Sequence, residues 1–187
     1  MDKLFYCHRN KHEVNPFLEK LGIFDNVGDV VVVTLKDLSL EEIEIPEEIE
    51  ESVVSEIGDE AFLNTKLKRI VLPSTILVVG KDAFPKDATI VYNGIEYDSF
   101  AINFEVKRRF NEMLNEQIDG VIEAVYQQEE IISIVKSCTS MEEVFEKIQD
   151  RFGLSEVQTK TILDIPLSLL SQLDIDQLES LKIEMDN

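Results

Sequence analysis

Cys7, His8, His12 and Glu13 have the side-chain types and the close spacing that could bind a metal ion. A structural zinc site normally takes four Cys or His ligands in a tetrahedral arrangement. The chain has only two Cys and two His in total, and Cys138 lies far away in the sequence. We therefore expect no metal site and no other cofactor. We expect residues 1–27 to be a polar lead-in whose apolar side chains form a short helix: Phe17, Leu18, Leu21, Ile23 and Phe24.

A run of glutamates between Glu41 and Glu51 is the second candidate for cation binding. Its acidic members are Glu41, Glu42, Glu44, Glu47, Glu48, Glu50 and Glu51. Calcium loops combine regularly spaced ligands with a glycine that allows a sharp turn, and this run contains no glycine. The pattern is more typical of a solvated edge, where charge also blocks unwanted strand pairing.

The charge balance argues against a nucleic-acid partner. The chain carries 18 Lys and Arg against 38 Asp and Glu, for a net charge of −20. Residues 28–100 and residues 101–187 each contribute −10. Binding to DNA depends on basic side chains that neutralise phosphates and release counterions, so an acidic chain is repelled. The sequence also lacks the glycine-rich Walker A motif that cradles ATP phosphates.

Cysteine content and hydropathy indicate a cytoplasmic protein. The two cysteines, Cys7 and Cys138, do not make a disulfide framework, which favours a reduced compartment. No apolar stretch reaches the length needed to cross a bilayer, so we expect no membrane partner. The N-terminal apolar stretch from Leu4 to Tyr6 is too short for the core of a signal peptide.

An internal repeat organises residues 28–97. The β-branched segment Val30–Leu35 predicts a strand. Further on, the segment 57–62 returns as the segment 79–84, and each has the order aliphatic, Gly, two polar residues, Ala, Phe. Repeats of this length, each pairing a short strand with a turn, indicate a leucine-rich solenoid. The predicted core of the repeat is Ile57, Ala61, Phe62, Val79, Ala83 and Phe84.

This module resembles the BspA-like bacterial leucine-rich repeats over residues 28–93. The resemblance rests on Ile43-x-Ile45-Pro46, on the Ile-Gly and Ala-Phe pairs that recur in order, and on the segment Thr89–Tyr92. It implies a β-solenoid, and such repeats serve as recognition surfaces. Two interpretations remain open, a small cap without a ligand and a surface that binds a partner, because few coils are present.

Apolar residues at helical spacing predict an all-α module over residues 98–187. The pattern starts at Phe104 and continues through Val135. Helix start and stop signals divide the remainder. We expect Ser140 or Thr139 to cap one helix, Gly153 to end it, and Ser155 with Gln158 to begin the next.

The second module resembles the exit-gate segment that DNA gyrase and topoisomerase IV carry in their A subunits, over residues 104–185. The segment from Arg151-Phe152 through Leu154-Ser155-Glu156 to Ile162-Leu163-Asp164 carries the resemblance. It implies two helical arms that end in a small tip, and a tip that pairs with its twin. The chain departs from the family at residues 165–174, where the arginines are absent and Pro166 is expected to break the helix.

The apolar residues around Pro166 are too dense for one face of a small helical tip. Core packing accounts for part of them, and the gyrase resemblance implies a two-fold interface for the rest. The predicted dimer interface lies within residues 155–178 and consists of Leu163, Ile165, Leu167, Leu169, Leu170 and Leu173.

The tyrosines do not indicate catalysis. Topoisomerase cleavage uses a tyrosine beside an arginine and a metal-binding domain, and no part of this chain matches that region. Aromatic packing is the expected role of all the tyrosines, Tyr6, Tyr92, Tyr97 and Tyr126. We therefore expect a protein that is not an enzyme.

The sequence predicts an α+β protein in which a short leucine-rich-repeat β-solenoid precedes an all-α domain. Its expected function is that of a non-catalytic interaction protein, a homodimer through the helical module that presents the repeat module to an unknown protein partner. One alternative is a regulator or decoy of DNA gyrase or topoisomerase IV, acting by mimicry of the gate tip or of acidic DNA. Another is a degenerate fusion with a purely structural role.

Overall fold

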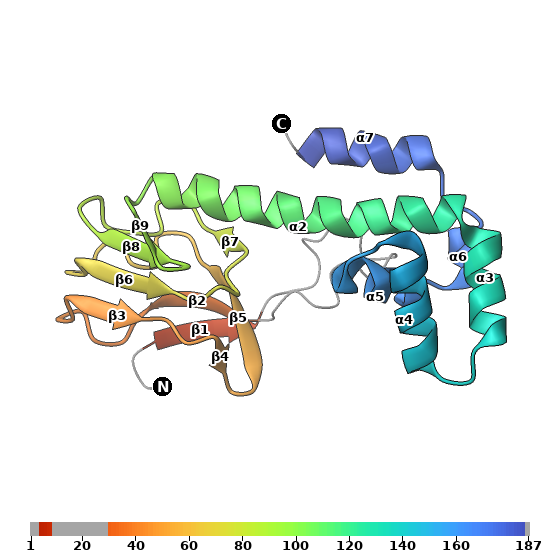
Figure 1. The fold of residues 1–187 in the computed structure, drawn as a ribbon. Helices are drawn as coiled ribbons and strands as arrows, with labels where there is room; N and C mark the ends of the chain where they lie inside the picture. The colour runs from red at the N-terminus through yellow and green to blue at the C-terminus, as the bar shows by residue number, and fades with distance from the viewer. Residues whose placement is uncertain (1–3, 9–29, 186–187) are drawn as a thin grey trace. The chain divides into compact units, whose positions relative to one another are not determined.

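The computed structural model describes residues 4–8 and 30–185, and within them all strands precede all helices (Figure 1). The strands are β1 (Leu4–His8), β2 (Val30–Leu35), β3 (Glu42–Glu44), β4 (Glu48–Ile49), β5 (Ser52–Ile57), β6 (Arg69–Leu72), β7 (Val78–Val79), β8 (Thr89–Tyr92) and β9 (Ile95–Tyr97). The helices are α2 (Ala101–Tyr126), α3 (Gln128–Ser137), α4 (Met141–Phe152), α5 (Glu156–Asp164), α6 (Leu167–Leu170) and α7 (Ile175–Met185). The predicted α+β class is confirmed.

The chain divides into two compact units, and the division falls inside α2, between Phe110 and Asn111. It therefore lies later than the boundary expected between residues 97 and 98. The physical reason is that Ile102 and Val106, in the first turns of α2, are buried in the same hydrophobic cluster as the strands. The first part of α2 thus belongs to the strand-rich unit.

Parallel ladders of aliphatic side chains build the first unit. In one sheet Val32 pairs with Ile57, which pairs in turn with Val79. In the other sheet Ile43, Ile70 and Ile90 are successive register partners, and all three are buried. Strands separated by a turn-containing segment thus stack in register, and each ladder removes a column of branched side chains from water.

The repeated turn stacks on its own copy. The N–H of Gly80 donates to the carbonyl of Ile57 at 2.7 Å, and the N–H of Phe62 donates to the carbonyl of Ala83 at 2.7 Å. A Cβ at Gly80 would lie 2.4 Å from the backbone nitrogen of Asp59, so only glycine allows this approach. Among the residues predicted to form the repeat core, Ile57, Ala61, Phe62, Ala83 and Phe84 are buried, and Val79 packs against the same cluster.

The N-terminal segment contributes a strand that the sequence did not predict. Strand β1 pairs antiparallel with β2, and Leu4 is buried in the core. Of the lead-in, residues 1–27, only Leu4–His8 have a described structure, and they form an extended strand. The short helix expected around Phe17 to Phe24 lies outside the described residues.

Two helices of the second unit, α4 and α5, have caps at the predicted positions. Ser140 Oγ accepts from the N–H of Glu143 at the start of α4, and Gly153 ends α4 in the left-handed conformation. Ser155 and Gln158 form a complete capping box at the start of α5. Within residues 4–8 and 30–185, no helix combines the length and the apolar character needed to cross a membrane.

Candidate interaction surface of the helical unit

The predicted interface residues follow one another along α5, α6 and the segments around them. Ile165 and Leu170 are buried within the single chain, with 5% and 3% of their surfaces exposed. Leu163, Leu169 and Leu173 are half-buried. Leu167 begins α6, and its side chain lies outside the described residues. Ile165 and Leu170 thus serve the unit's own core, whereas the half-buried leucines keep apolar surface that a partner could cover.

Pro166 separates α5 from α6, as the sequence predicted. Helix α5 ends at Asp164, and the N–H of Ile165 donates back to the carbonyl of Ile162 at 3.4 Å. The carbonyl of Pro166 then accepts from the N–H groups of Leu169 and Leu170 at 2.8 and 3.0 Å. A proline cannot donate to the helix ladder, so the chain turns here and restarts as the single turn of α6.

The start of α5 is fixed to α2 by polar contacts and by close packing. Ser155 Oγ accepts from the N–H of Gln158 and donates to Glu116 Oε1 at 2.6 Å. A Cβ added at Gly120 would lie 3.0 Å from Gln158 Cβ, so α5 approaches α2 more closely than most side chains would allow. The hydroxyl of the fully buried Thr159 donates to the carbonyl of Ser155. These contacts position the residues that follow, including Leu163.

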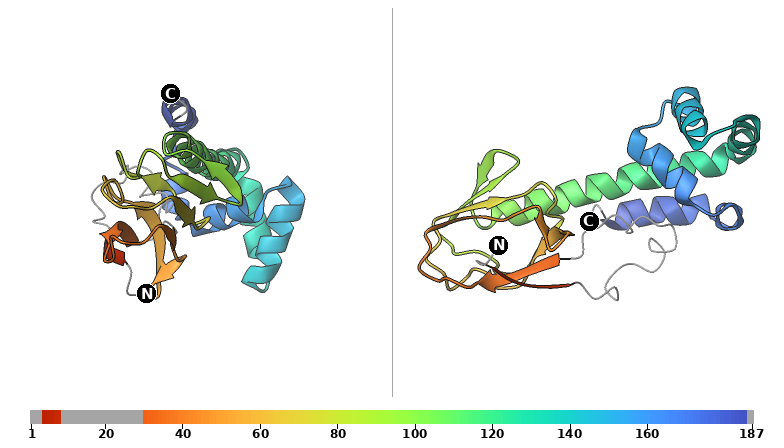
Figure 2. Two further views of the ribbon diagram at one scale, coloured as in Figure 1. Left: turned by 90° about the vertical axis from the view of Figure 1, so that its left-hand side faces the viewer. Right: turned by 90° about the horizontal axis from the view of Figure 1, so that it is seen from below.

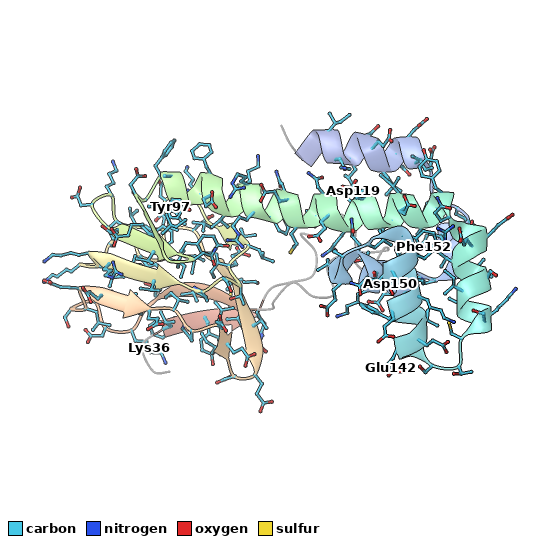
Figure 3. The ribbon with its side chains drawn as sticks, in the orientation of Figure 1. Lys36, Tyr97, Asp119, Glu142, Asp150 and Phe152 are labelled. Carbon is cyan, nitrogen blue, oxygen red and sulfur yellow. The ribbon has the colours of Figure 1, made fainter. Side chains whose placement is uncertain are left out.

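Helices α2 and α7 are the two arms of the unit. In Figures 1 and 2, α7 runs back alongside the second half of α2, and the tip helices α3–α6 connect the two. Asp119 of α2, labelled in Figure 3, forms an ion pair with Lys182 of α7. Ile118 and Val121 of α2 and Leu178 of α7 are fully buried. The two arms thus have buried apolar residues between them and an ion pair beside these residues. This is the arrangement of a short antiparallel helix pair.

One ion pair joins α4 to α3, and another lies within α4. Arg151 Nε of α4 lies 2.6 Å from Glu130 Oε1 of α3, and this contact raises the pKa of the arginine. Within α4, a hydrogen bond from Lys147, with a second from the N–H of Thr139, lowers the pKa of Glu143 from 4.5 to about 2. Glu143 is therefore ionised at neutral pH, and its negative charge is paired with Lys147 of the same helix.

The remaining exterior of the unit mixes acidic and apolar side chains. Glu142, Glu146 and Asp150 are exposed at intervals of four residues, so they form an acidic stripe along α4. Figure 3 labels Glu142 and Asp150. Among the described residues of the unit, the exposed large apolar side chains are those of Tyr126, Val135, Met141, Val157 and Ile183. Val157 belongs to the same helix as Leu163, so it adds apolar surface to the helix that carries the predicted interface.

The tyrosines occupy different environments. Tyr92 is buried, which raises its pKa, and its hydroxyl donates to the carbonyl of Ile76 at 3.0 Å. Tyr6 and Tyr97 pack against the same core, which confirms the predicted packing role for these three residues. Tyr126 is 64% exposed, so the prediction of aromatic packing was wrong for this residue. It stands at the C-terminal end of α2, where the chain turns into α3.

The other candidate residues are dispersed on the surface. All seven glutamates between Glu41 and Glu51 are exposed, which confirms the predicted solvated edge. Cys7 and His8 are exposed on β1, and His12 and Glu13 lie outside the described residues. Among residues 4–8 and 30–185, no group of three or more His, Cys, Asp or Glu is close enough to hold a metal ion.

Sequence reasoning missed the contacts that join distant segments. Nothing in the spacing of Glu116 or Glu130 marks them as partners of Ser155 and Arg151. Gly120 offered a signal, because a glycine in the middle of a long amphipathic helix is unfavourable and suggests that something packs closely there.

Comparisons with known proteins give low-identity similarities. No protein-family model matches the chain. Over 92% of its length it is 23% identical to the DNA gyrase A subunit of Mycoplasma pneumoniae, and over 90% it is 24% identical to that of Fibrobacter succinogenes. A shorter stretch, 33% of the chain, is 36% identical to the DNA gyrase A subunit of Borreliella burgdorferi. The chain spans about a fifth of the length of the first two of these relatives.

Among solved structures, a leucine-rich-repeat protein of T. pallidum matches with a TM-score of 0.31 and 20% identity. The match covers 35% of this chain and 33% of that protein.

Proposed function

We propose that this chain is a non-catalytic interaction protein that forms a two-fold dimer through the tip of its helical unit. One observation carries the proposal: Leu163, Leu169 and Leu173 are half-buried around the break at Pro166, at the end of a helix that is fixed to α2. A rigid support with apolar surface at its end is what a small interface needs. The similarity to the A subunit of DNA gyrase over most of the chain supports a gate-like tip that meets its own copy.

The strand-rich unit would then present a second surface. We propose that it is a short solenoid of the leucine-rich-repeat type. The in-register ladders through Ile57 and Ile70 and the stacked turns at Gly58 and Gly80 support this assignment. Stacked repeats offer an extended surface formed by several coils, which suits them to protein recognition.

A non-catalytic role is consistent with the environment of Tyr92, whose hydroxyl bonds to a backbone carbonyl inside the core. The net charge of −20 opposes DNA binding. We therefore expect the protein neither to cleave nor to relax DNA, and not to shift duplex DNA in a gel at about 0.15 M salt. A salt-sensitive shift at low protein concentration would contradict this part of the proposal.

The dimer is tested by light scattering on a size-exclusion column. The chain has a mass of 21.4 kDa, and we expect twice that mass at tens of micromolar protein. Leu169→Glu should restore the monomer, because the two-fold axis brings two charges into one apolar contact. Leu38→Glu is a matched control on the first unit, where Leu38 is 55% exposed, and it should leave the mass unchanged. A parent protein that elutes as a monomer would refute the dimer.

A second candidate function is regulation of DNA gyrase or topoisomerase IV. The observation that favours it is the similarity to the A subunit of DNA gyrase over 92% of this chain but only 22% of the relative. A tip of this kind could dock into the gate of the larger enzyme, and the acidic stripe of Glu142, Glu146 and Asp150 could imitate DNA toward a basic surface.

A supercoiling assay separates the two candidates. Added protein should inhibit a bacterial gyrase if the second candidate is correct, and Leu169→Glu should relieve the inhibition if the tip docks into the gate. Charge reversal at Glu142 and Glu146 should relieve it instead if DNA mimicry is responsible. Unchanged supercoiling at a large excess of protein leaves self-association as the function of the tip.

A further inference from the structure

Phe100 and Phe104 are an exposed aromatic pair in the strand-rich unit. Their exposed fractions are 71% and 61%, the two highest among the large apolar residues of that unit that the structure describes. Their rings contact each other edge to face, with centroids 4.9 Å apart. Large apolar side chains exposed side by side mark an interaction site more often than single ones do.

The local structure holds both rings in place on the outside of the unit. Asp98 Oδ1 accepts from the N–H groups of Ala101 and Phe100, at 2.7 and 2.8 Å, and so fixes the start of α2. Ile102 and Val106 are buried on the opposite face of the same helix. Because their burial sets the rotation of α2, Phe104 must face away from the core.

Basic side chains continue this exposed face. Lys107, Arg108 and Arg109 form the only run of three consecutive basic residues in the sequence. Lys107 is exposed, and Arg108 lies about one turn beyond Phe104, where it pairs with Glu105 at 2.7 Å. That contact neutralises the carboxylate of Glu105, the residue next to Phe104. Residues 98–109, which contain the aromatic pair, carry Lys107, Arg108 and Arg109 against Asp98 and Glu105, a net charge of +1 within a chain that carries −20.

We propose that Phe100, Phe104, Lys107 and Arg108 form a docking surface, the aromatic–basic surface, for an acidic amphipathic helix of a partner protein. Two aromatic rings in contact on the surface make a ridge that fits between the apolar side chains of a second helix. Carboxylates on the border of that helix would meet Lys107 and would share Arg108 with Glu105. This inference deepens the proposed interaction function by naming the surface of the first unit and the chemistry of its partner.

Single-stranded nucleic acid uses similar side chains, since bases stack on aromatic rings and phosphates bind basic residues. The net charge of −20 favours the protein helix, because a polyanion meets long-range repulsion that a short acidic helix with fewer charges feels less. The experiment therefore includes an oligonucleotide as a competing ligand.

The test uses the full chain and a fluorescein-labelled peptide of about 18 residues, with Leu and Phe at helical spacing, Glu on the border of that apolar face and Gln elsewhere. A scrambled peptide of the same composition is the ligand control. Fluorescence anisotropy measures binding to the parent protein and to Phe100→Ser, Phe104→Ser and Lys107→Glu. Phe5→Ser is the matched protein control, because Phe5 is 53% exposed on β1 and has Lys36 at 5.5 Å from its ring.

We expect saturable binding of the amphipathic peptide and at least roughly tenfold weaker binding by each Phe variant, the loss typical of a central interface residue. Lys107→Glu should also weaken binding, and Phe5→Ser should not. The inference is overturned if the parent protein does not bind, if the scrambled peptide binds equally well, or if Phe5→Ser has the same effect. Tighter binding of single-stranded oligo-dT, lost in the same variants, would reassign the surface to nucleic acid.

Light scattering on the same samples keeps this test separate from that of the dimer. Phe100→Ser and Phe104→Ser should keep the mass of the parent protein, whatever that mass is. The dimer proposal depends on Leu169 in the second unit, so either proposal can fail without the other.

Discussion

The rings of Phe62 and Phe84 stack on each other, with centroids 6.0 Å apart and planes inclined by 22°. They occupy the same position in consecutive copies of the repeat, and both are buried. The N–H of Phe62 donates to the carbonyl of Ala83, so the backbone follows the same stacking. The pair therefore forms the contact by which one coil of the strand-rich unit packs on the next.

Truncation of either ring should destabilise the protein strongly. We expect Phe62→Ala and Phe84→Ala each to cost about 3–5 kcal/mol of unfolding free energy, because a large buried side chain leaves a cavity. Urea denaturation followed by circular dichroism gives the values. Phe104→Ala, at an exposed position in the same unit, should change stability by about 0.5 kcal/mol or less. If both buried variants unfold like the parent protein, the stacked arrangement is wrong.

The hairpin between β4 and β5 should gain stability from a glycine. Glu48 pairs with Val53 and Ile49 with Ser52, which leaves Glu50 and Glu51 as a two-residue loop. Both have positive φ, 51° and 65°, a conformation that favours Asn and Gly. Glu51→Gly should therefore raise the unfolding free energy by about 1 kcal/mol, measured by urea denaturation. The same change at Glu48, within the strand, should lower it by a similar amount.

Removal of the Ser155 hydroxyl should loosen α5. Ser155→Ala eliminates the side-chain half of the capping box and the bond to Glu116. We expect a loss of about 1–3 kcal/mol, since a cap and an interhelical hydrogen bond disappear together. Ser180→Ala on α7 removes a hydroxyl that bonds back to its own helix, and should have little effect. Hydrogen exchange of the α5 amides measures the loosening directly.

Acid should weaken the contacts of Glu143. Its pKa is about 2 in the folded protein, below the ordinary 4.5, because Lys147 and the N–H of Thr139 bond to the carboxylate. A lowered folded pKa means that the stabilisation is complete above about pH 4.5 and is lost as the pH falls toward 2. Glu143→Gln should therefore reduce the dependence of Tm on pH in this window.

A carbon-detected NMR titration of Glu143 should give a midpoint near 2. Glu146→Gln removes the same charge from an exposed position on the same helix, and it should leave the pH dependence of Tm closer to that of the parent protein. A Glu143 midpoint near 4.5 would show that the bonds to Lys147 and Thr139 do not form in solution.

Local patterns in the sequence determined much of the fold. The recurrence of Gly-x-x-Ala-Phe was sufficient to predict that Phe62 and Phe84 are equivalent and buried, since a repeat places each side chain in the same surroundings. The caps at Ser140, Gly153 and Ser155 were predictable because a helix end is satisfied by residues within one turn of it.

Only the tertiary structure decided which distant residues meet. Strand β1 carries too few residues to show a period, and it is a strand because β2 offers it an edge. Likewise, the apolar residues around Pro166 are all Leu or Ile, but packing buries Ile165 and Leu170 and leaves Leu163 and Leu169 partly exposed. Hydropathy measures how apolar a residue is. Whether its side chain faces the core or solvent depends on neighbours that are close in space but remote in the sequence.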